Sequence, residues 1–211
     1  VGAGGFSNSI RDCLFTGCNH GVYTVAQASD SLLIDHCMFI YNSNYDIYVD
    51  INNVVRIVNN NFVGNQKSPL SSAANVFLSI GSSSESAGYS TIVHNKFGAE
   101  GRTDGTCIEI SGNTSGAITS LTIEDNLFHF DATAVSENAI KLTNVQMRGV
   151  TIRANSVLYC SLLDYSTQSN GVIQGYNNIA GNAFLTGGSF SQITRGSFDV
   201  DDRIEPTPPE K

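Results

Sequence analysis

The hexad Ile57-Val58-Asn59-Asn60-Asn61-Phe62 has a pattern that recurs along the chain. Each copy has isoleucine first, asparagine or cysteine fourth, and phenylalanine or valine last. Seven copies occur, starting 23 to 35 residues apart, at Ile10, Ile34, Ile57, Ile92, Ile123, Ile152 and Ile179. A repeat of this period is typical of a solenoid, whose repeats bury their apolar faces only by stacking on one another. The sequence therefore predicts stacked coils of constant cross-section joined by loops of variable length.

Apolar residues alternate with polar ones within each repeat, as in Leu121-Thr122-Ile123. This alternation is typical of strands and leaves little room for helices. A second strand is expected later in the repeats, at residues 22–25, 47–51, 76–80, 108–110 and 140–142. We therefore expect an all-β parallel solenoid of about seven coils over residues 1–195. The proline-containing, charged stretch 196–211 is expected to leave the stack as an extended linker or cap.

The fourth hexad residue is expected to point inward and to form a ladder of asparagines from Asn60 to Asn182. Stacking places equivalent residues about 4.8 Å apart. Each side-chain amide can then bond to the next coil and satisfy backbone groups of the bend. Cys13 and Cys37 take the first two positions, where we expect a stacked pair of reduced thiols. None of the five cysteines shows a metal-binding spacing.

The composition narrows the possible partners. The chain has 25 Ser, 21 Asn and 20 Gly, which favour turns, and a formal net charge of −8. That charge argues against binding to nucleic acid or to anionic lipid. No stretch approaches the roughly 18 apolar residues of a membrane span, so membrane insertion is not expected. Because the sequence begins without Met, we expect it to be a piece of a larger polypeptide.

The repeat resembles the right-handed parallel β-helix of pectate-lyase-like proteins and bacteriophage tailspikes. Residues 33–39, 46–50 and 55–60 are similar to the Trp-Ile-Asp-His block of pectate lyases and its neighbours. That family's later Arg-x-Pro-x-x-Arg element has no counterpart, since no proline lies between Pro69 and Pro206. The polygalacturonase elements Asn-Thr-Asp, Asp-Asp and His-Gly are missing as a set. The resemblance to tailspikes implies one chain of a homotrimer in a phage virion that acts at the bacterial cell surface.

The candidate site follows from loop length. Insertions at 63–75, 81–90, 98–106 and 112–119 are expected to wall a groove over strands 76–80 and 107–111. Outward residues there form two columns. Column one is Tyr23/Tyr48/Phe77/Glu109/Lys141, and column two is Asp50/Ser79/Ser111/Thr143. Aromatic rings can lie on the apolar faces of sugars while carboxylates bond to hydroxyls, so this surface suits an extended saccharide. Two alternatives stay open: a contact between neighbouring chains, and residues that merely favour strands.

Glycoside hydrolysis requires two carboxylates, about 5 Å apart for retention or about 6.5–9.5 Å apart for inversion. Glu109 is the first catalytic candidate, and Asp50 or Asp104 is its possible partner. The expected stacking separates the Cα atoms of Asp50 and Glu109 by about 11–12 Å. Asp104 lies beside a glycine, where aspartate often serves a turn, and Arg102 could meet an acidic sugar. No metal ion or cofactor is predicted.

A third set of residues follows the hexad isoleucine at the bend: Asp12, His36, Asn59, His94 and Asp125. Histidine beside aspartate could serve acid–base chemistry or bind a metal. Turns favour aspartate and asparagine in any case, so the turn interpretation is preferred.

These observations lead to a tailspike-type segment that binds a bacterial surface polysaccharide, with endoglycosidic hydrolysis as the favoured reaction. Whether the segment is catalytic stays open. One alternative is a non-catalytic shaft or adhesin segment. The other is a secreted polysaccharide lyase, which would need a base beside a carboxylate and a cation that stabilises the enolate.

Overall fold

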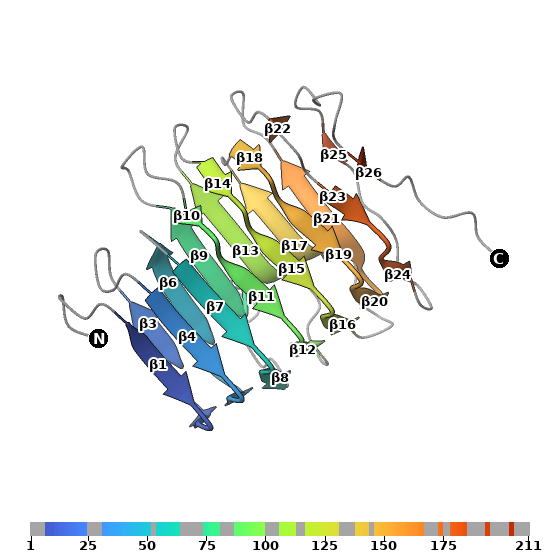
Figure 1. Ribbon diagram of the computed structural model, residues 1–211. Coiled ribbons are helices and arrows are strands. Elements are labelled where there is room, and N and C mark those ends of the chain that lie inside the picture. Colours follow the sequence, from blue (N-terminus) through green and yellow to red (C-terminus); the bar gives the residue numbers. More distant parts are fainter. Residues whose placement is uncertain are drawn as a thin grey trace.

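The chain forms a right-handed parallel β-helix in which all described strand pairs are parallel. The structure is a computed structural model. It describes residues 7–24, 31–51, 54–63, 74–80, 87–99, 106–112, 117–130, 138–143, 146–166, 173–174, 178–184, 193–194 and 203–204. Figure 1 shows the strands of successive coils side by side in sequence order, from blue to red. The described residues contain strands and turns but no helix, as the alternating pattern predicts.

Three long sheets and one short sheet run along the solenoid. Sheet 1 contains the start of each hexad and consists of β1 (Asn8–Arg11), β4 (Ser31–Asp35), β7 (Val54–Val58), β11 (Thr91–Val93), β15 (Thr122–Glu124), β19 (Thr151–Arg153), β23 (Asn178–Ala180) and β26 (Arg203–Ile204). Sheet 2 contains the end of each hexad and consists of β2 (Leu14–Thr16), β5 (Met38–Ile40), β8 (Asn61–Val63), β12 (Lys96–Ala99), β16 (Leu127–Phe130), β20 (Ser156–Leu158) and β24 (Ala183–Phe184).

Sheet 3 contains the second strand that the alternation predicts. It consists of β3 (Val22–Thr24), β6 (Ile47–Ile51), β9 (Val76–Ile80), β13 (Thr106–Gly112), β17 (Asn138–Thr143), β21 (Ser161–Ser166) and β25 (Ile193–Thr194). Sheet 4 was not predicted and consists of β10 (Ala87–Gly88), β14 (Ala117–Thr119), β18 (Gln146–Arg148) and β22 (Ile173–Gln174). Its strands have only two or three residues, too few to show a pattern of alternation.

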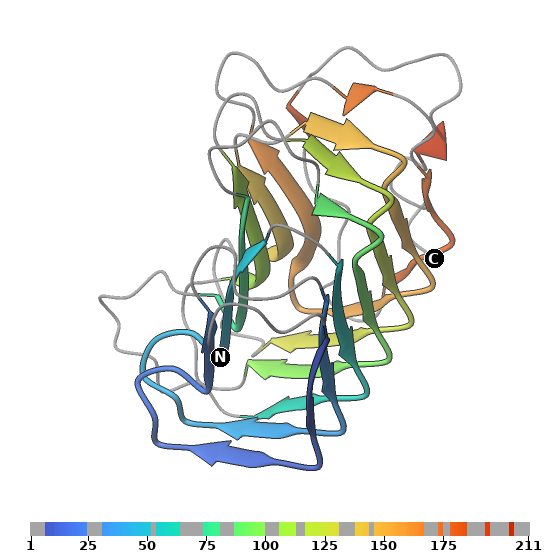
Figure 2. The same cartoon turned by 60° about the vertical axis from the view of Figure 1, so that its left-hand side comes forward.

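The hexads lie directly on one another, which confirms the predicted stacking. The register pairs the seven isoleucines in one file. The five from Ile34 to Ile152 have no exposed surface. The phenylalanines form a second file, with centroids of neighbouring rings 4.6–5.1 Å apart and ring planes within 13° of parallel. Figure 2 shows the long sheets on different sides of this interior. Seven hexads thus define the six full turns between them.

The bend between sheets 1 and 2 is a left-handed turn, which confirms the turn interpretation of the third residue set. Asp12, His36, Asn59, His94 and Asp125 all have φ between 52° and 57°. The equivalent positions in the last two coils are Ala154 at 53° and Gly181 at 69°. Among residues other than glycine, aspartate and asparagine tolerate this conformation best. The recurrence of Asp and Asn at the bend therefore has a backbone cause.

The asparagine ladder forms as predicted. The Oδ1 atom of Asn126 accepts hydrogen bonds from the backbone N–H and the side-chain Nδ2 of Asn95, at 2.9 and 3.0 Å. Its Nδ2 donates to the carbonyl of Ile92 at 2.9 Å and to Oδ1 of Asn155 at 3.0 Å. The same pattern links Asn60, Asn95, Asn155 and Asn182. Each rung thus satisfies backbone groups that the bend would otherwise leave buried and unpaired.

Cysteine ends this ladder at its N-terminal side. All five cysteines lie within the described residues as thiols, as predicted, and none is in a disulfide. The backbone N–H of Cys37 donates to Oδ1 of Asn60 at 2.9 Å. The side chain of Cys37 cannot continue the amide pattern, and its Sγ donates to the carbonyl of Asp35 at 3.4 Å. Burial is the main cause that raises the pKa of the Cys37 thiol.

Two described residues come from the predicted linker or cap. They form β26, which pairs in parallel with β23 through Asn178–Arg203 and Ile179–Ile204. The stretch thus adds a short strand to the end of sheet 1. The division at residue 195 stays a prediction, because the other residues from 196 to 211 lie outside the described ranges. No helix in the described chain has the length and apolar character needed to cross a membrane.

Candidate functional site

The outer surface of sheet 3 carries the two predicted columns in register. Tyr23 pairs with Tyr48, Tyr48 with Phe77, Phe77 with Glu109, and Glu109 with Lys141. The second column places side by side Asp50, Ser79, Ser111 and Thr143. Alternation along each strand sends their neighbours into the core: Val49, Leu78, Ile110 and Leu142 are buried. The geometry of both columns therefore follows from strand period and register.

Column one begins as a stack of aromatic rings. The ring centroids of Tyr23 and Tyr48 lie 4.8 Å apart with planes at 21°, and those of Tyr48 and Phe77 lie 5.3 Å apart at 6°. Tyr48 is thus sandwiched between two neighbours, which cover both faces of its ring. We expected sugar rings to lie on these faces. The stack instead offers ring edges and phenol hydroxyls, and Tyr23 at its end is 50% exposed.

Two further rings, which the sequence analysis missed, complete the aromatic cluster. The Tyr45 ring lies 5.4 Å from that of Tyr48 and 5.0 Å from that of Phe77, tilted by 51° and 44°. The His20 ring lies 4.9 Å from that of Tyr23 and 5.8 Å from that of Tyr45. Both residues precede sheet 3 strands and stand outside the alternating pattern. The signal that could have found them is their position, in each case two residues before the predicted strand.

A buried polar clamp fixes the corner that presents Tyr45. Asp46, the next residue, is 1% exposed, and its two carboxylate oxygens accept hydrogen bonds from Nδ2 of Asn42 at 2.8 Å and of Asn75 at 2.7 Å. Both asparagines are also buried. The backbone carbonyl of Asn75 accepts further bonds from the N–H groups of Asp46 and Ile47. Since buried carboxylates require such partners, the clamp holds Tyr45 in place against the stack.

Glu109 and Lys141 continue column one beyond the rings. Nζ of Lys141 lies 3.9 Å from Oε1 of Glu109, and the two side chains are 35% and 15% exposed. Burial raises the pKa of Glu109, and the neighbouring ammonium of Lys141 opposes this rise only in part. The pKa of Tyr45 is also raised, by burial first and then by the negative charge of Glu109 and by Tyr48. Glu109 therefore combines restricted solvent access with a raised pKa.

The other predicted catalytic carboxylates are not brought to Glu109 by the described residues. Asp50 lies in column two on β6, two strands from β13, which preserves the expected Cα separation of about 11–12 Å. Among the described residues, its Oδ1 atom is buried without a hydrogen-bond partner, and so is Oγ1 of Thr143 in the same column. Asp104 and Arg102 lie outside the described residues, as do most of the insertions expected to wall the groove. Asp50 and Asp104 therefore stay predictions as catalytic partners.

The bend residues lie on a different edge, between sheets 1 and 2. Nδ1 of His36 lies 2.7 Å from Oδ1 of Asp35, and Nε2 of His94 lies 3.3 Å from Oδ2 of Asp125. Both histidine side chains are about 60% exposed, at 61% and 59%. Within the described ranges, no group of three or more His, Cys, Asp or Glu side chains could hold a metal ion. The contacts are those of stacked polar turns.

The fold of this chain is assigned from its own geometry. No protein-family model, no curated protein and no solved structure matches this chain. The parallel β-helix follows from the strand order and register. Any function must be argued from the residues on its surface, because one scaffold of this kind hosts many activities.

Proposed function

We propose that the chain binds an extended polysaccharide along the outer surface of sheet 3. The observation that carries this proposal is the cluster of Tyr23, Tyr45, Tyr48 and Phe77, which runs along the solenoid axis into Glu109. Aromatic residues joined to a few polar groups are typical of saccharide recognition, because sugars have both C–H surfaces and hydroxyls.

The two columns offer different groups to the saccharide. Column one supplies ring edges for the apolar C–H groups of the sugar, and the hydroxyls of Tyr23 and Tyr48 for its polar groups. Column two supplies hydroxyls from Ser79 and Ser111 at the coil spacing of about 4.8 Å. A linear polymer that lies along the axis can repeat the same contacts on successive coils.

The biological setting that we infer is a bacteriophage tailspike, whose ligand is a polysaccharide of the bacterial surface. The parallel β-helix, the Ser/Asn/Gly-rich coils and the resemblance of the repeat support this setting. It includes assembly into a homotrimer and a place in the virion, with a secreted protein as the alternative location.

Endoglycosidic hydrolysis is the reaction to test, with Glu109 as the proton donor. A general acid requires a carboxyl that is protonated near the working pH, and burial moves Glu109 in that direction. Hydrolysis also needs a second carboxylate, for which Asp50 and Asp104 are the candidates. A Glu109→Gln variant keeps the shape, and loss of the acid is expected to lower turnover by about 10²–10⁴-fold. Full turnover in this variant would remove Glu109 from the chemistry.

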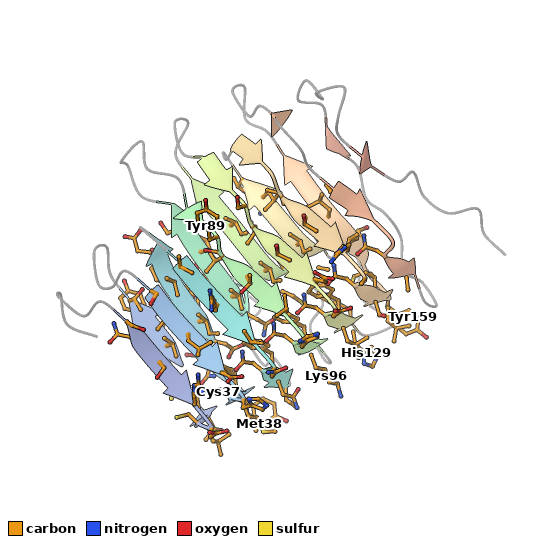
Figure 3. The ribbon with its side chains drawn as sticks, viewed as in Figure 1. Cys37, Met38, Tyr89, Lys96, His129 and Tyr159 are labelled. Atoms are coloured by element: carbon orange, nitrogen blue, oxygen red, sulfur yellow. The ribbon has the colours of Figure 1, made fainter. Side chains whose placement is uncertain are left out.

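The experiment is to incubate the protein with purified capsular polysaccharides and lipopolysaccharides of candidate hosts, and to follow binding and new reducing ends. Phe77→Ala and Tyr48→Ala are expected to weaken binding. Lys96→Ala is the matched control, because its exposed side chain projects from sheet 2 at the lower edge of the view in Figure 3. Equal binding by all variants would contradict the proposal. Products with an unsaturated sugar would identify a lyase instead.

A non-catalytic shaft is the second candidate, and the ring geometry favours it in one respect. The rings of Tyr48 and Phe77 are almost parallel and cover each other, which also stabilises a stack of coils without any ligand. If this is their role, Tyr48→Ala lowers the free energy of unfolding while no polysaccharide binds the parent protein.

A further inference from the structure

The charged residues on sheet 3 limit the kind of saccharide that this sheet can bind. Among the described residues of the two columns, Asp50 and Glu109 are acidic and Lys141 is the one basic residue. Lys141 already faces Glu109, with its Nζ 3.9 Å from Oε1. The two columns thus have a negative balance, on a chain whose formal net charge is −8.

Glu109 can donate a proton only while it is protonated; above its raised pKa the carboxyl is ionised, and the groups around it then experience a negative field. The pKa of Tyr45 is raised by burial and then by the charge of Glu109. Burial of Glu109 limits how well solvent screens this charge. A carboxylate on a bound sugar would meet the same field and would be repelled.

The polar groups of column two are also of the wrong kind for an anion. Proteins bind carboxylates with unpaired arginine, lysine or several N–H donors. Column two instead offers the hydroxyls of Ser79 and Ser111 and the carboxyl group of Asp50. Among the described residues, Oδ1 of Asp50 and Oγ1 of Thr143 are buried and have no hydrogen-bond partner. Sugar hydroxyls can donate hydrogen bonds to a carboxylate such as Asp50, whereas a sugar carboxylate has no proton to donate.

We propose that the saccharide bound on sheet 3 is neutral and rich in hydroxyls, and that Asp50 and Glu109 together reject polymers that carry uronic or sialic acids. This inference rests on the proposed function, since it names the substrate class of the same surface. The residues of the two columns, rather than the overall charge of the chain, discriminate between neutral and acidic saccharides.

The test uses a panel of purified capsular polysaccharides and O-antigens, both neutral and uronic-acid-containing. Each acidic polymer is also tested after chemical reduction of its carboxyl groups, which removes the charge and keeps the backbone. We expect the bound polymers to be neutral, and any reduced polymer that binds to do so at least about tenfold more tightly than its acidic parent. Tighter binding of an acidic parent than of its reduced form would overturn the inference while leaving polysaccharide binding intact. Absence of binding across the panel would overturn the proposed function, and the inference with it.

Variants of the two columns test which residues cause the preference for uncharged polymers. Glu109→Gln and Asp50→Asn are expected to reduce the preference for the reduced polymer several-fold. Glu124→Gln changes the net charge equally on sheet 1, where Glu124 pairs with Arg153 at 2.8 Å, and is expected to leave the preference unchanged. An equal effect of Glu124→Gln would show that overall charge makes the selection and would overturn the role of the columns. If Asp50→Asn does not fold, Glu109→Gln against Glu124→Gln decides the question.

Discussion

At the scale of single residues, the asparagine ladder shows how one side chain can serve two coils. The side chain of Asn126 makes four hydrogen bonds, to the backbone and side chain of Asn95, to Ile92 and to Asn155. Asn126→Ala should lower the free energy of unfolding by about 1–3 kcal/mol, because it leaves buried partners unsatisfied. The urea midpoint at unchanged slope measures this loss. Asn61→Ala is the control, since Oδ1 of Asn61 has no hydrogen-bond partner among the described residues; an equal loss there would contradict the ladder's special contribution.

Glu109 is expected to cost stability at neutral pH. Burial raises its folded-state pKa above the ordinary value of 4.5, so the folded state binds the proton more tightly than the unfolded state. The penalty is absent below the unfolded pKa, grows as the pH rises towards the folded pKa, and is complete above it. Glu109→Gln should therefore unfold at higher urea than the parent at pH 7, and the difference should shrink at pH 4. A less stable variant at pH 7 would mean that the contact with Lys141 outweighs burial.

At the scale of elements, the hexads predict strands and register because two independent periods coincide. Alternation identifies the strands, and the recurrence of Ile, Asn and Phe aligns them between coils. The columns of sheet 3 could therefore be predicted from the sequence. Tyr45 could not, because its position depends on a corner held by Asn42, Asp46 and Asn75 rather than on a strand. The strands of sheet 4 were not predicted for a related reason, because segments of two or three residues are too short to show a pattern of alternation.

The corner before sheet 3 also depends on close packing at Gly21. A Cβ atom there would lie 2.6 Å from the backbone oxygen of Asp46 and 2.7 Å from Cδ1 of Phe39. Gly21→Ala should destabilise the fold by about 1–3 kcal/mol, because neither neighbour can move without disturbing the core. Gly98→Ala is the matched control, since its added Cβ would meet only the Phe62 carbonyl at 3.4 Å. Thermal unfolding of both variants makes the comparison, and equal midpoints would show that the corner relaxes easily.

At the scale of the whole molecule, stability is a sum over neighbouring coils, so the cost of a core change depends on where along the axis it occurs. The ring of Phe97 is fully buried and stacks on two neighbours, Phe62 at 4.6 Å and Phe128 at 5.1 Å. Phe15, in the first described coil, is only partly buried and has one described ring neighbour, Phe39 at 5.0 Å.

Phe97→Ala should therefore cost about 3–5 kcal/mol, the range for deleting a buried aromatic ring, and Phe15→Ala clearly less. The two changes delete the same atoms from equivalent hexad positions, so their difference isolates the contribution of a second stacked neighbour. Urea unfolding of the two variants, compared with the parent at one pH, gives both costs. Equal losses would mean that the first described coil is as fully enclosed as the middle of the stack, for example by contacts that form only when several chains associate.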